Sequence, residues 1–307
     1  MVDIYLDGEE MLDAEAKTDV AKFCPHMLLD GRVVPFDTAF KCVYSSMLEY
    51  GVVIKDHIVC TGNNMIMGKT HHMILERNME LLGFGFAHFP SYHDFKNDVA
   101  LLNYNNKYPS YSRLTLYCWF DTSSVNNHVR WVMLQTRLTE LPYTTNNLRP
   151  IMKTYKESFL SVNKWSKIKM SSFVDLMAER EMSAGGYWGA CLLNERGNIV
   201  RTTKGNLYLI VKEGSGLSVL YVDEESGAYT DSLFDMLDHA LHKLRYNVRC
   251  VKEFTNRDLQ NALEAFVLDS SFGVQLVIGI DNERYSDNNL TSDISATFVK
   301  TINSIME

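Results

Sequence analysis

Strands alternate with helices throughout the second half of the sequence, and this order constrains the fold more than any other feature. Apolar residues recur at helical spacing in four segments, and short β-rich runs lie between them. The expected helices are 171–181, 232–246, 256–265 and 291–306, and the expected strands are 190–193, 206–211, 217–222, 248–251, 265–268 and 274–280. Helices in such an order must cover the faces of a sheet, so we predict a mixed α/β or α+β fold.

The first half predicts a β-hairpin and two further strands. Two short apolar runs flank Asp30 and Gly31, which together are a strong turn signal. Pro35 is expected to end the second run, because proline has no backbone N–H to donate. The further strands are expected at 114–120 and 128–136, where aromatic and β-branched residues gather.

Two helices are also expected in the first half. The segment 70–82 repeats apolar residues at helical spacing, with Thr70 as the expected N-cap and Gly83 as the expected stop. The second helix is expected at 93–103.

A change in composition at 141–150 marks the expected domain boundary. This stretch, LPYTTNNLRP, has two prolines, two asparagines and no apolar periodicity. A length of 307 residues suggests two domains, at about 150 residues per domain. The predicted organisation is an N-terminal lead-in at 1–25, a small α+β domain at 26–140, the linker at 141–150 and a larger α/β domain at 151–307.

Composition and charge exclude several classes of protein. The 38 acidic and 30 basic side chains give a net charge of −8, which argues against general nucleic-acid binding. No apolar run reaches the roughly 18 residues of a membrane span, and the acidic start lacks the features of a secretory signal. The six cysteines form no CxxC pair, which indicates reduced, mostly buried thiols in a cytoplasmic protein.

Local motifs give no catalytic or metal site. The stretch 62–70, GNNMIMGKT, has five residues between its glycines where a phosphate-binding loop requires four. The histidine pairs His71/His72 and His239/His242 have no acidic or cysteine partner at metal-site spacing, so we interpret them as solvated helix residues. Neither a G-x-S-x-G nor a GxGxxG motif is present.

Five segments follow one another in an informative order. They are DGRVVPFDTA, HHMILERNMELLGF, KIKMSSF, LLNERGNIVRTTKGNLYLI and EAFVLDSS. Their layout and apolar pattern, from about Met27 to Ile305, resembles the fold-type IV pyridoxal-phosphate-dependent enzymes. That family includes branched-chain and D-amino-acid aminotransferases and aminodeoxychorismate lyase. The resemblance implies a two-domain class IV aminotransferase-like fold with a cofactor cleft between the domains.

The resemblance implies a role for one lysine. In the family, a lysine just before a helix forms the Schiff base with the cofactor, and the segment KMSSF puts Lys169 at that position. Lys167 is the alternative, because a small insertion or deletion would exchange the two. The chemistry requires a desolvated and partly neutral amine that can attack an aldehyde.

The contact to the pyridine nitrogen departs from the family. Relatives place an acidic residue in an I-x-E-G-x-x-x-N segment, and the matching stretch here places Arg201 at that position. A carboxylate keeps the pyridine protonated and makes it a strong electron sink, whereas an arginine leaves it unprotonated. Arginine therefore implies weaker carbanion stabilisation.

The phosphate contacts are also altered. Lys69 stands near the family's phosphate arginine, and Ser232 corresponds roughly to its G-I-T loop before a helix. Ser270 and Ser271 match its T-G-T-A motif and retain hydroxyl donors. The predicted cofactor-binding residues are thus Lys69, Arg201, Ser232, Ser270 and Ser271, and no metal ligand is predicted.

Two functions remain open. The resemblance implies pyridoxal-phosphate-dependent chemistry on a small amino acid or keto acid, by an aminotransferase or a lyase, in a homodimer that binds neither nucleic acid nor membrane. The altered contacts support an alternative, a non-catalytic relative that keeps the fold, has lost the cofactor and acts as a binding or scaffold protein. The sequence favours the enzyme, with Lys169 as its catalytic residue.

Overall fold

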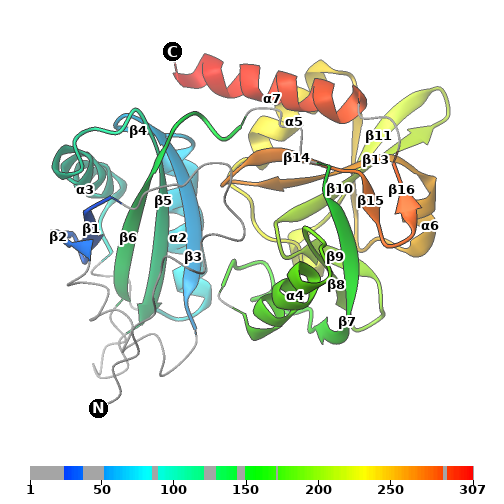
Figure 1. The fold of residues 1–307 in the computed structure, drawn as a ribbon, viewed down its shortest axis with the longest axis horizontal. Coiled ribbons are helices and arrows are strands. Elements are labelled where there is room, and N and C mark those ends of the chain that lie inside the picture. Colours follow the sequence, from blue (N-terminus) through cyan, green and yellow to red (C-terminus); the bar gives the residue numbers. More distant parts are fainter. Residues whose placement is uncertain are drawn as a thin grey trace.

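The computed structural model describes residues 24–36, 52–84, 89–120, 129–143, 149–170, 172–285 and 289–306. Figure 1 shows the chain as two groups of elements, with one sheet on the left and two smaller sheets on the right. The predicted mixed α/β class is confirmed, since helices cover all three sheets. Within the described ranges, no helix is both long enough and apolar enough to cross a membrane.

The first sheet is antiparallel and has six strands in the order β2-β1-β6-β5-β3-β4. Its strands are β1 (His26–Leu29), β2 (Arg32–Pro35), β3 (Ile54–Thr61), β4 (Asn64–Met65), β5 (Tyr111–Phe120) and β6 (Val129–Leu138). The predicted hairpin is β1 and β2, and it ends at Pro35 as expected. Asp30 and Gly31 both have positive φ angles, of 47° and 77°, which suit the tight turn between twisted strands.

Two helices accompany this sheet, α2 (Gly68–Leu81) and α3 (Tyr92–Asn105). The expected N-cap of α2 is wrong, because the helix begins directly after the β3–β4 hairpin and Thr70 lies inside its first turn. Met67 precedes the helix in a left-handed conformation and provides no side-chain cap. The expected stop is confirmed at Gly83, whose φ of 72° ends the helical path.

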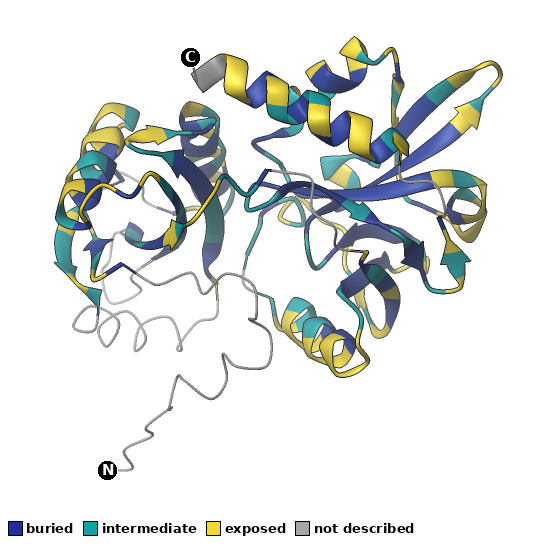
Figure 2. Cartoon of the chain, turned by 45° about the horizontal axis from the view of Figure 1, so that its top comes forward, coloured by how far each residue is buried: buried dark blue, intermediate teal, exposed yellow. Residues whose placement is uncertain are grey.

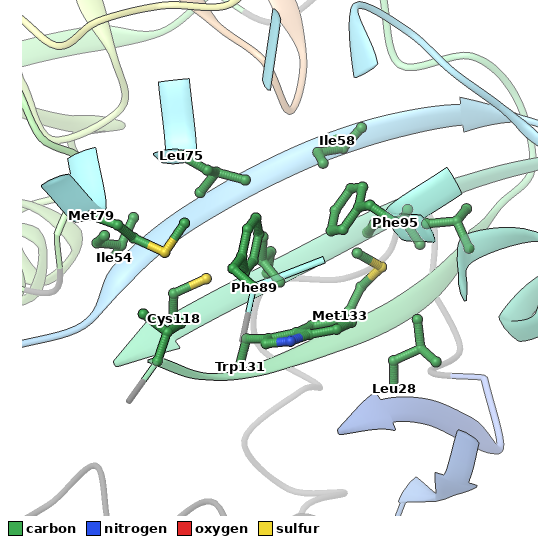
Figure 3. Close-up of a cluster of buried hydrophobic side chains, with 14 of the residues drawn as sticks. Leu28, Ile54, Ile58, Leu75, Met79, Phe89, Phe95, Cys118, Trp131 and Met133 are labelled. Carbon is green, nitrogen blue, oxygen red and sulfur yellow. The ribbon is translucent and has the colours of Figure 1, made fainter. Parts of the chain in front are cut away.

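An apolar core lies between the first sheet and its helices. Figure 3 shows the aromatic rings of Phe89, Phe95 and Trp131 gathered over the strands, with aliphatic and sulfur-containing side chains around them. Each phenylalanine ring lies 6.1 Å from the Trp131 ring, and Trp131 is only 2% exposed. Burial of such rings is a large source of apolar stabilisation.

Residues 151 onward form two five-stranded sheets. One has the order β12-β11-β10-β13-β14, and the other has the order β16-β15-β7-β8-β9. The strands are β7 (Ile151–Leu160), β8 (Gly189–Asn194), β9 (Ile199–Thr202), β10 (Asn206–Glu213), β11 (Gly216–Val222), β12 (Asn247–Val251), β13 (Ala262–Asp269), β14 (Gly273–Val277), β15 (Gly279–Ile280) and β16 (Glu283–Arg284). The sequence analysis did not predict β7. This strand carries several charged residues and begins directly after the expected linker.

The helices of this part match the expected segments, with shifted ends. They are α4 (Phe173–Ala184), α5 (Phe234–Lys243), α6 (Asn256–Asn261) and α7 (Asn289–Met306), with a short 3-10 turn, η2 (Glu224–Ser226). Thr255 caps α6 through a reciprocal pair of hydrogen bonds with Asp258. Figure 2 shows the buried residues along the sheets and on the inner sides of the helices. The boundary at 141–150 stays a prediction, and 144–148 lie outside the described residues.

Five of the six cysteines fall in the described ranges, and all five are free thiols. Four of them are buried and Cys250 is exposed, which agrees with the expectation of mostly buried thiols. Cys42 lies outside the described residues.

Candidate functional site

A polar cavity lies where the first sheet meets the rest of the molecule. Its walls come from β3, α2, the segment before α4, the start of β10, the segment 229–232 and the end of β13. The cavity has a volume of about 30 Å³. Elements from both halves of the chain therefore contribute to one enclosed space.

Lys169 is fixed in this wall by the main chain. The backbone N–H of Lys55 in β3 donates to the carbonyl of Lys169 at 2.8 Å, and the next residue, Met170, pairs with Ile54. Asp269 is the last residue of β13, opposite Gly205. Gly205 has a φ of 148° and lies so close to β13 that an added Cβ would be 2.3 Å from the Leu268 carbonyl oxygen. Only glycine fits this approach.

The Lys169 ammonium donates to Asp269 Oδ2 and forms an ion pair with it. The other carboxylate oxygen accepts from the Ser271 N–H at 2.9 Å and from its hydroxyl at 2.6 Å. Burial opposes ionisation of both partners, but their mutual attraction is stronger. The pKa of Lys169 is therefore raised and the pKa of Asp269 is lowered, so both groups are charged near neutral pH.

Asp231 is a second carboxylate of the cavity. Its pKa is raised to about 6 by burial and then by repulsion from Asp269, although a hydrogen bond from the Leu233 backbone and the attraction of Lys169 partly oppose this. The backbone N–H of Leu233 donates to Asp231 Oδ1 at 2.8 Å. Of the three carboxylates that line the cavity, Asp269 is thus ionised at neutral pH and Asp231 titrates at about pH 6.

Three hydrogen-bonded side chains, Asp56, His71 and Ser232, form another wall of the cavity. Asp56 Oδ2 lies 2.7 Å from His71 Nδ1, and His71 Nε2 lies 2.8 Å from Ser232 Oγ. His71 is 1% exposed and Ser232 is 5% exposed. These hydrogen bonds join β3, α2 and the segment that leads into α5.

The expectation that His71 and His72 are solvated is wrong. His72 is 3% exposed, its Nε2 lies 2.9 Å from the Pro90 carbonyl oxygen, and its ring packs near three aromatic rings. Both histidines are buried because α2 is enclosed on more than one side, which helical periodicity alone does not reveal. His239 and His242 are exposed, as expected.

Lys169, Ser232 and Ser270 of the sequence-predicted residues line the cavity. Lys69 is exposed outside it, and Ser271 contacts it only through Asp269. Lys167, the alternative lysine, forms a 2.5 Å ion pair with the exposed Glu225 on the surface.

Arg201 is buried behind Tyr229 and does not line the cavity. Its guanidinium lies 4.2 Å from the Tyr229 ring centre, hydrogen-bonds the tyrosine hydroxyl and approaches Asp175 of α4 at 3.4 Å. Its Nε atom is buried and has no hydrogen-bond partner among the described residues.

Sequence reasoning missed three contributors to the cavity, namely Lys55, Asp56 and the buried state of His71. Lys55 lines the cavity, and its pKa is lowered by burial and by repulsion from Lys169. Lys55 is followed by two further polar residues in β3, Asp56 and His57, so apolar alternation gave no signal for its position. In the part of the chain that the structure describes, no group of metal-ligating side chains is found.

Pyridoxal phosphate does not fit these residues as they stand. The lysine that would carry the cofactor is a charged ammonium held by Asp269, and the two carboxylates Asp231 and Asp269 would face a phosphate dianion. Like charges in such a closed space are unfavourable.

No protein-family model matches the sequence, and no curated protein sequence matches it. Solved structures do match the fold. The chain is similar to a branched-chain aminotransferase from Thermoproteus uzoniensis with norvaline, with a TM-score of 0.78 and 17% identity over 91% of this chain and 95% of that one.

Two further structures agree. The Escherichia coli branched-chain amino acid aminotransferase has a TM-score of 0.76 and 15% identity, over 90% of this chain and 93% of that one. The corresponding enzyme from Thermobaculum terrenum, solved as a mutant, has a TM-score of 0.76 and 15% identity, over 92% and 95%. The chain therefore has the class IV aminotransferase fold, as predicted, whereas the substrate, the cofactor and the homodimer stay predictions.

Proposed function

We propose that this chain keeps the class IV aminotransferase fold without pyridoxal phosphate and acts by binding a small molecule rather than by transamination. The observation that carries the proposal is the ion pair between Lys169 and Asp269. An amine must lose its proton to attack an aldehyde. The raised pKa of Lys169 opposes that loss, so the expected cofactor lysine is held in its unreactive form.

The rest of the site supports the same proposal. Arg201 is engaged by Asp175 and Tyr229 behind the cavity wall, and Lys69 points away at the surface. Neither is placed to hold a phosphate in the cavity. The polar side chains around Ser232 and Ser270 suit a small polar ligand.

A second candidate is pyridoxal-phosphate-dependent amino-group chemistry, as an aminotransferase or a lyase. One observation favours it: Arg201 Nε is a buried donor with no partner in the described ranges, and a pyridine nitrogen would be a suitable acceptor. In this candidate Lys169, Ser232 and Ser270 would hold the cofactor, which supplies an electron sink. It requires Asp269 to release Lys169.

An absorbance spectrum of the purified protein, with and without added pyridoxal phosphate, tests the proposal. Borohydride treatment and peptide mapping then locate any attached cofactor. We expect no visible band and no label on Lys169, in a protein whose circular dichroism shows that it is folded.

Two variants sharpen this test. A band that disappears in Lys169→Ala and persists in Lys167→Ala would overturn the proposal in favour of the second candidate. Amino-acid donors would then be screened for transfer of the amino group. A label on surface lysines that is equal in both variants is adventitious and supports the proposal.

A further inference from the structure

The hydrogen-bonded chain from Asp56 through His71 to Ser232 has the connectivity of an acyl-transfer site. A serine nucleophile needs a base within hydrogen-bond reach, and that base needs a group that orients it. Ser232 Oγ lies 2.8 Å from His71 Nε2, and Asp56 lies 2.7 Å from His71 Nδ1. Both distances fall in the required range of roughly 2.6–3.2 Å.

The network also fixes the direction of the hydrogen bonds. The Asp56 carboxylate can only accept when it is ionised, so His71 carries its proton on Nδ1 and donates to it. His71 Nε2 is then the acceptor for the Ser232 hydroxyl. The second Asp56 oxygen accepts from the His57 backbone N–H at 2.8 Å, which holds the carboxylate in place.

Lys169 is the group near Ser232 that favours a carbonyl oxygen as it becomes negatively charged, whereas Asp231 and Asp269 in the same cavity oppose that charge. Lys169 lines the same cavity as Ser232 and is held as an ammonium by Asp269. Ser232 also lies two residues before the first residue of α5, close to the positive end of that helix. Fixed positive charge near a developing oxyanion stabilises it.

We propose that Ser232 is a nucleophile for short acyl groups, with His71 as its general base and Asp56 as the residue that positions His71. Ser232 is only 5% exposed, so the acyl group that reaches its hydroxyl must be small. This inference goes beyond the proposed binding function, because it assigns a covalent step to the same cavity.

A larger hollow that adjoins the cavity indicates which kind of alcohol the ester would release. It has a volume of about 340 Å³ and shares Asn206, Tyr229 and Asp231 with the cavity. Aromatic and acidic side chains line it, and its described lining residues include no lysine, arginine or histidine. Such a surface favours a neutral or cationic alcohol. The substrate class is therefore a short-chain ester of an uncharged or cationic alcohol.

The reaction balances without a cofactor. The Ser232 hydroxyl proton passes to His71 Nε2 as the Oγ–carbon bond forms, and the ester bond to the alcohol breaks as the alcohol oxygen takes that proton. Water then attacks the acyl-serine, gives a proton to His71, and the carboxylic acid leaves as Ser232 Oγ regains the proton. The sum is ester plus water to acid plus alcohol.

The test uses the full-length protein and 4-nitrophenyl acetate. We expect a burst of nitrophenol of about one equivalent and an acetyl group on Ser232 by peptide mass spectrometry. Ser232→Ala should abolish both, and His71→Gln should slow acylation by roughly 100-fold or more. Ser218→Ala is the matched control, because Ser218 is buried like Ser232. Its hydroxyl donates to the Glu213 carboxylate and not to a histidine. It should leave the burst unchanged.

The role of Asp56 must be tested by a measurement that would not change if Asp56 only stabilised the fold. Asp56→Asn should lower the acylation rate constant with little change in the ester concentration at half-maximal rate, and Asp56→Glu should restore part of that rate. Acetylation confined to lysines such as Lys55, at equal rates in wild type and Ser232→Ala, would overturn the inference. An acylation rate that is unaffected by His71→Gln in the folded protein would overturn it as well.

Adding pyridoxal phosphate separates this inference from the proposed function. If the cofactor attaches to Lys169 and blocks acetylation of Ser232, the proposed cofactor-free function is wrong and the nucleophile is still supported. If no cofactor attaches and Ser232 is not acetylated, the nucleophile is wrong and the cofactor-free function stands.

Discussion

The core of the first sheet packs Trp131 against two phenylalanine rings, whereas the neighbouring cavity pairs Lys169 with a buried carboxylate. The first region is stabilised by apolar area and close packing, which require no particular partner for any one atom. The second depends on individual charges that must meet, because an unpaired buried charge is costly. The core therefore tolerates substitutions that conserve volume, and the cavity tolerates changes that conserve charge balance.

The largest expected effect comes from the core. Trp131→Ala should lower the free energy of unfolding by about 3–5 kcal/mol, because it removes apolar contacts and leaves a cavity. Trp165→Ala is the control, since that indole is 42% exposed, and its effect should stay below about 1 kcal/mol. Urea unfolding measures both. Equal effects at the two tryptophans would contradict the assignment of Trp131 to the core.

The next effect tests the charges of the cavity. Lys169→Met should cost about 3 kcal/mol in urea unfolding, because Asp269, whose side chain is 6% exposed, loses its counterion. The double variant Lys169→Met with Asp269→Asn should recover most of that loss. Lys167→Met should cost less than about 1 kcal/mol, since its partner Glu225 is 74% exposed. If the double variant is no more stable than Lys169→Met, charge balance does not control the stability of the cavity, and the contrast with the apolar core is wrong.

The smallest effect depends on pH. The folded state raises the pKa of Asp231 from 3.8 to about 6, so it binds a proton more tightly than the unfolded chain does. Its contribution to stability is present at low pH and is lost as the pH rises from about 4 through 6. Asp269 and Lys169 are the charged residues that act on Asp231 there. Asp231→Asn should gain stability relative to wild type across this window, by about 1–2 kcal/mol after allowance for partial exposure.

Urea unfolding of both proteins between about pH 4 and pH 8 provides the measurement. The difference between them isolates Asp231 from other titrating groups, because the remaining residues are common to both. An Asn variant whose stability runs parallel to wild type over the whole range would show that Asp231 is ionised normally.

The sequence by itself determined the elements whose signals are local. The Asp30-Gly31 turn and the stop at Gly83 appear as predicted, because each depends on the conformational preferences of a few consecutive residues. Apolar periodicity also placed the helices of the second half and the mixed α/β class. The strand β7 has no comparable local signal, because its charged residues break the apolar run.

Only the tertiary structure decided the chemistry of the cavity. Lys169 and Asp269 are 100 positions apart, and His71 and Ser232 are 161 apart, so no local pattern brings them together. The sequence did place Lys169, Ser232 and Ser270 on the segments that line the cavity. It left open whether the lysine amine is free or paired, because the pKa of a buried group is set by its neighbours in space and by its loss of water. The fold brings those neighbours into contact. Asp269 holds Lys169 as an ammonium, in the same cavity as Ser232 and its hydrogen-bond partner His71.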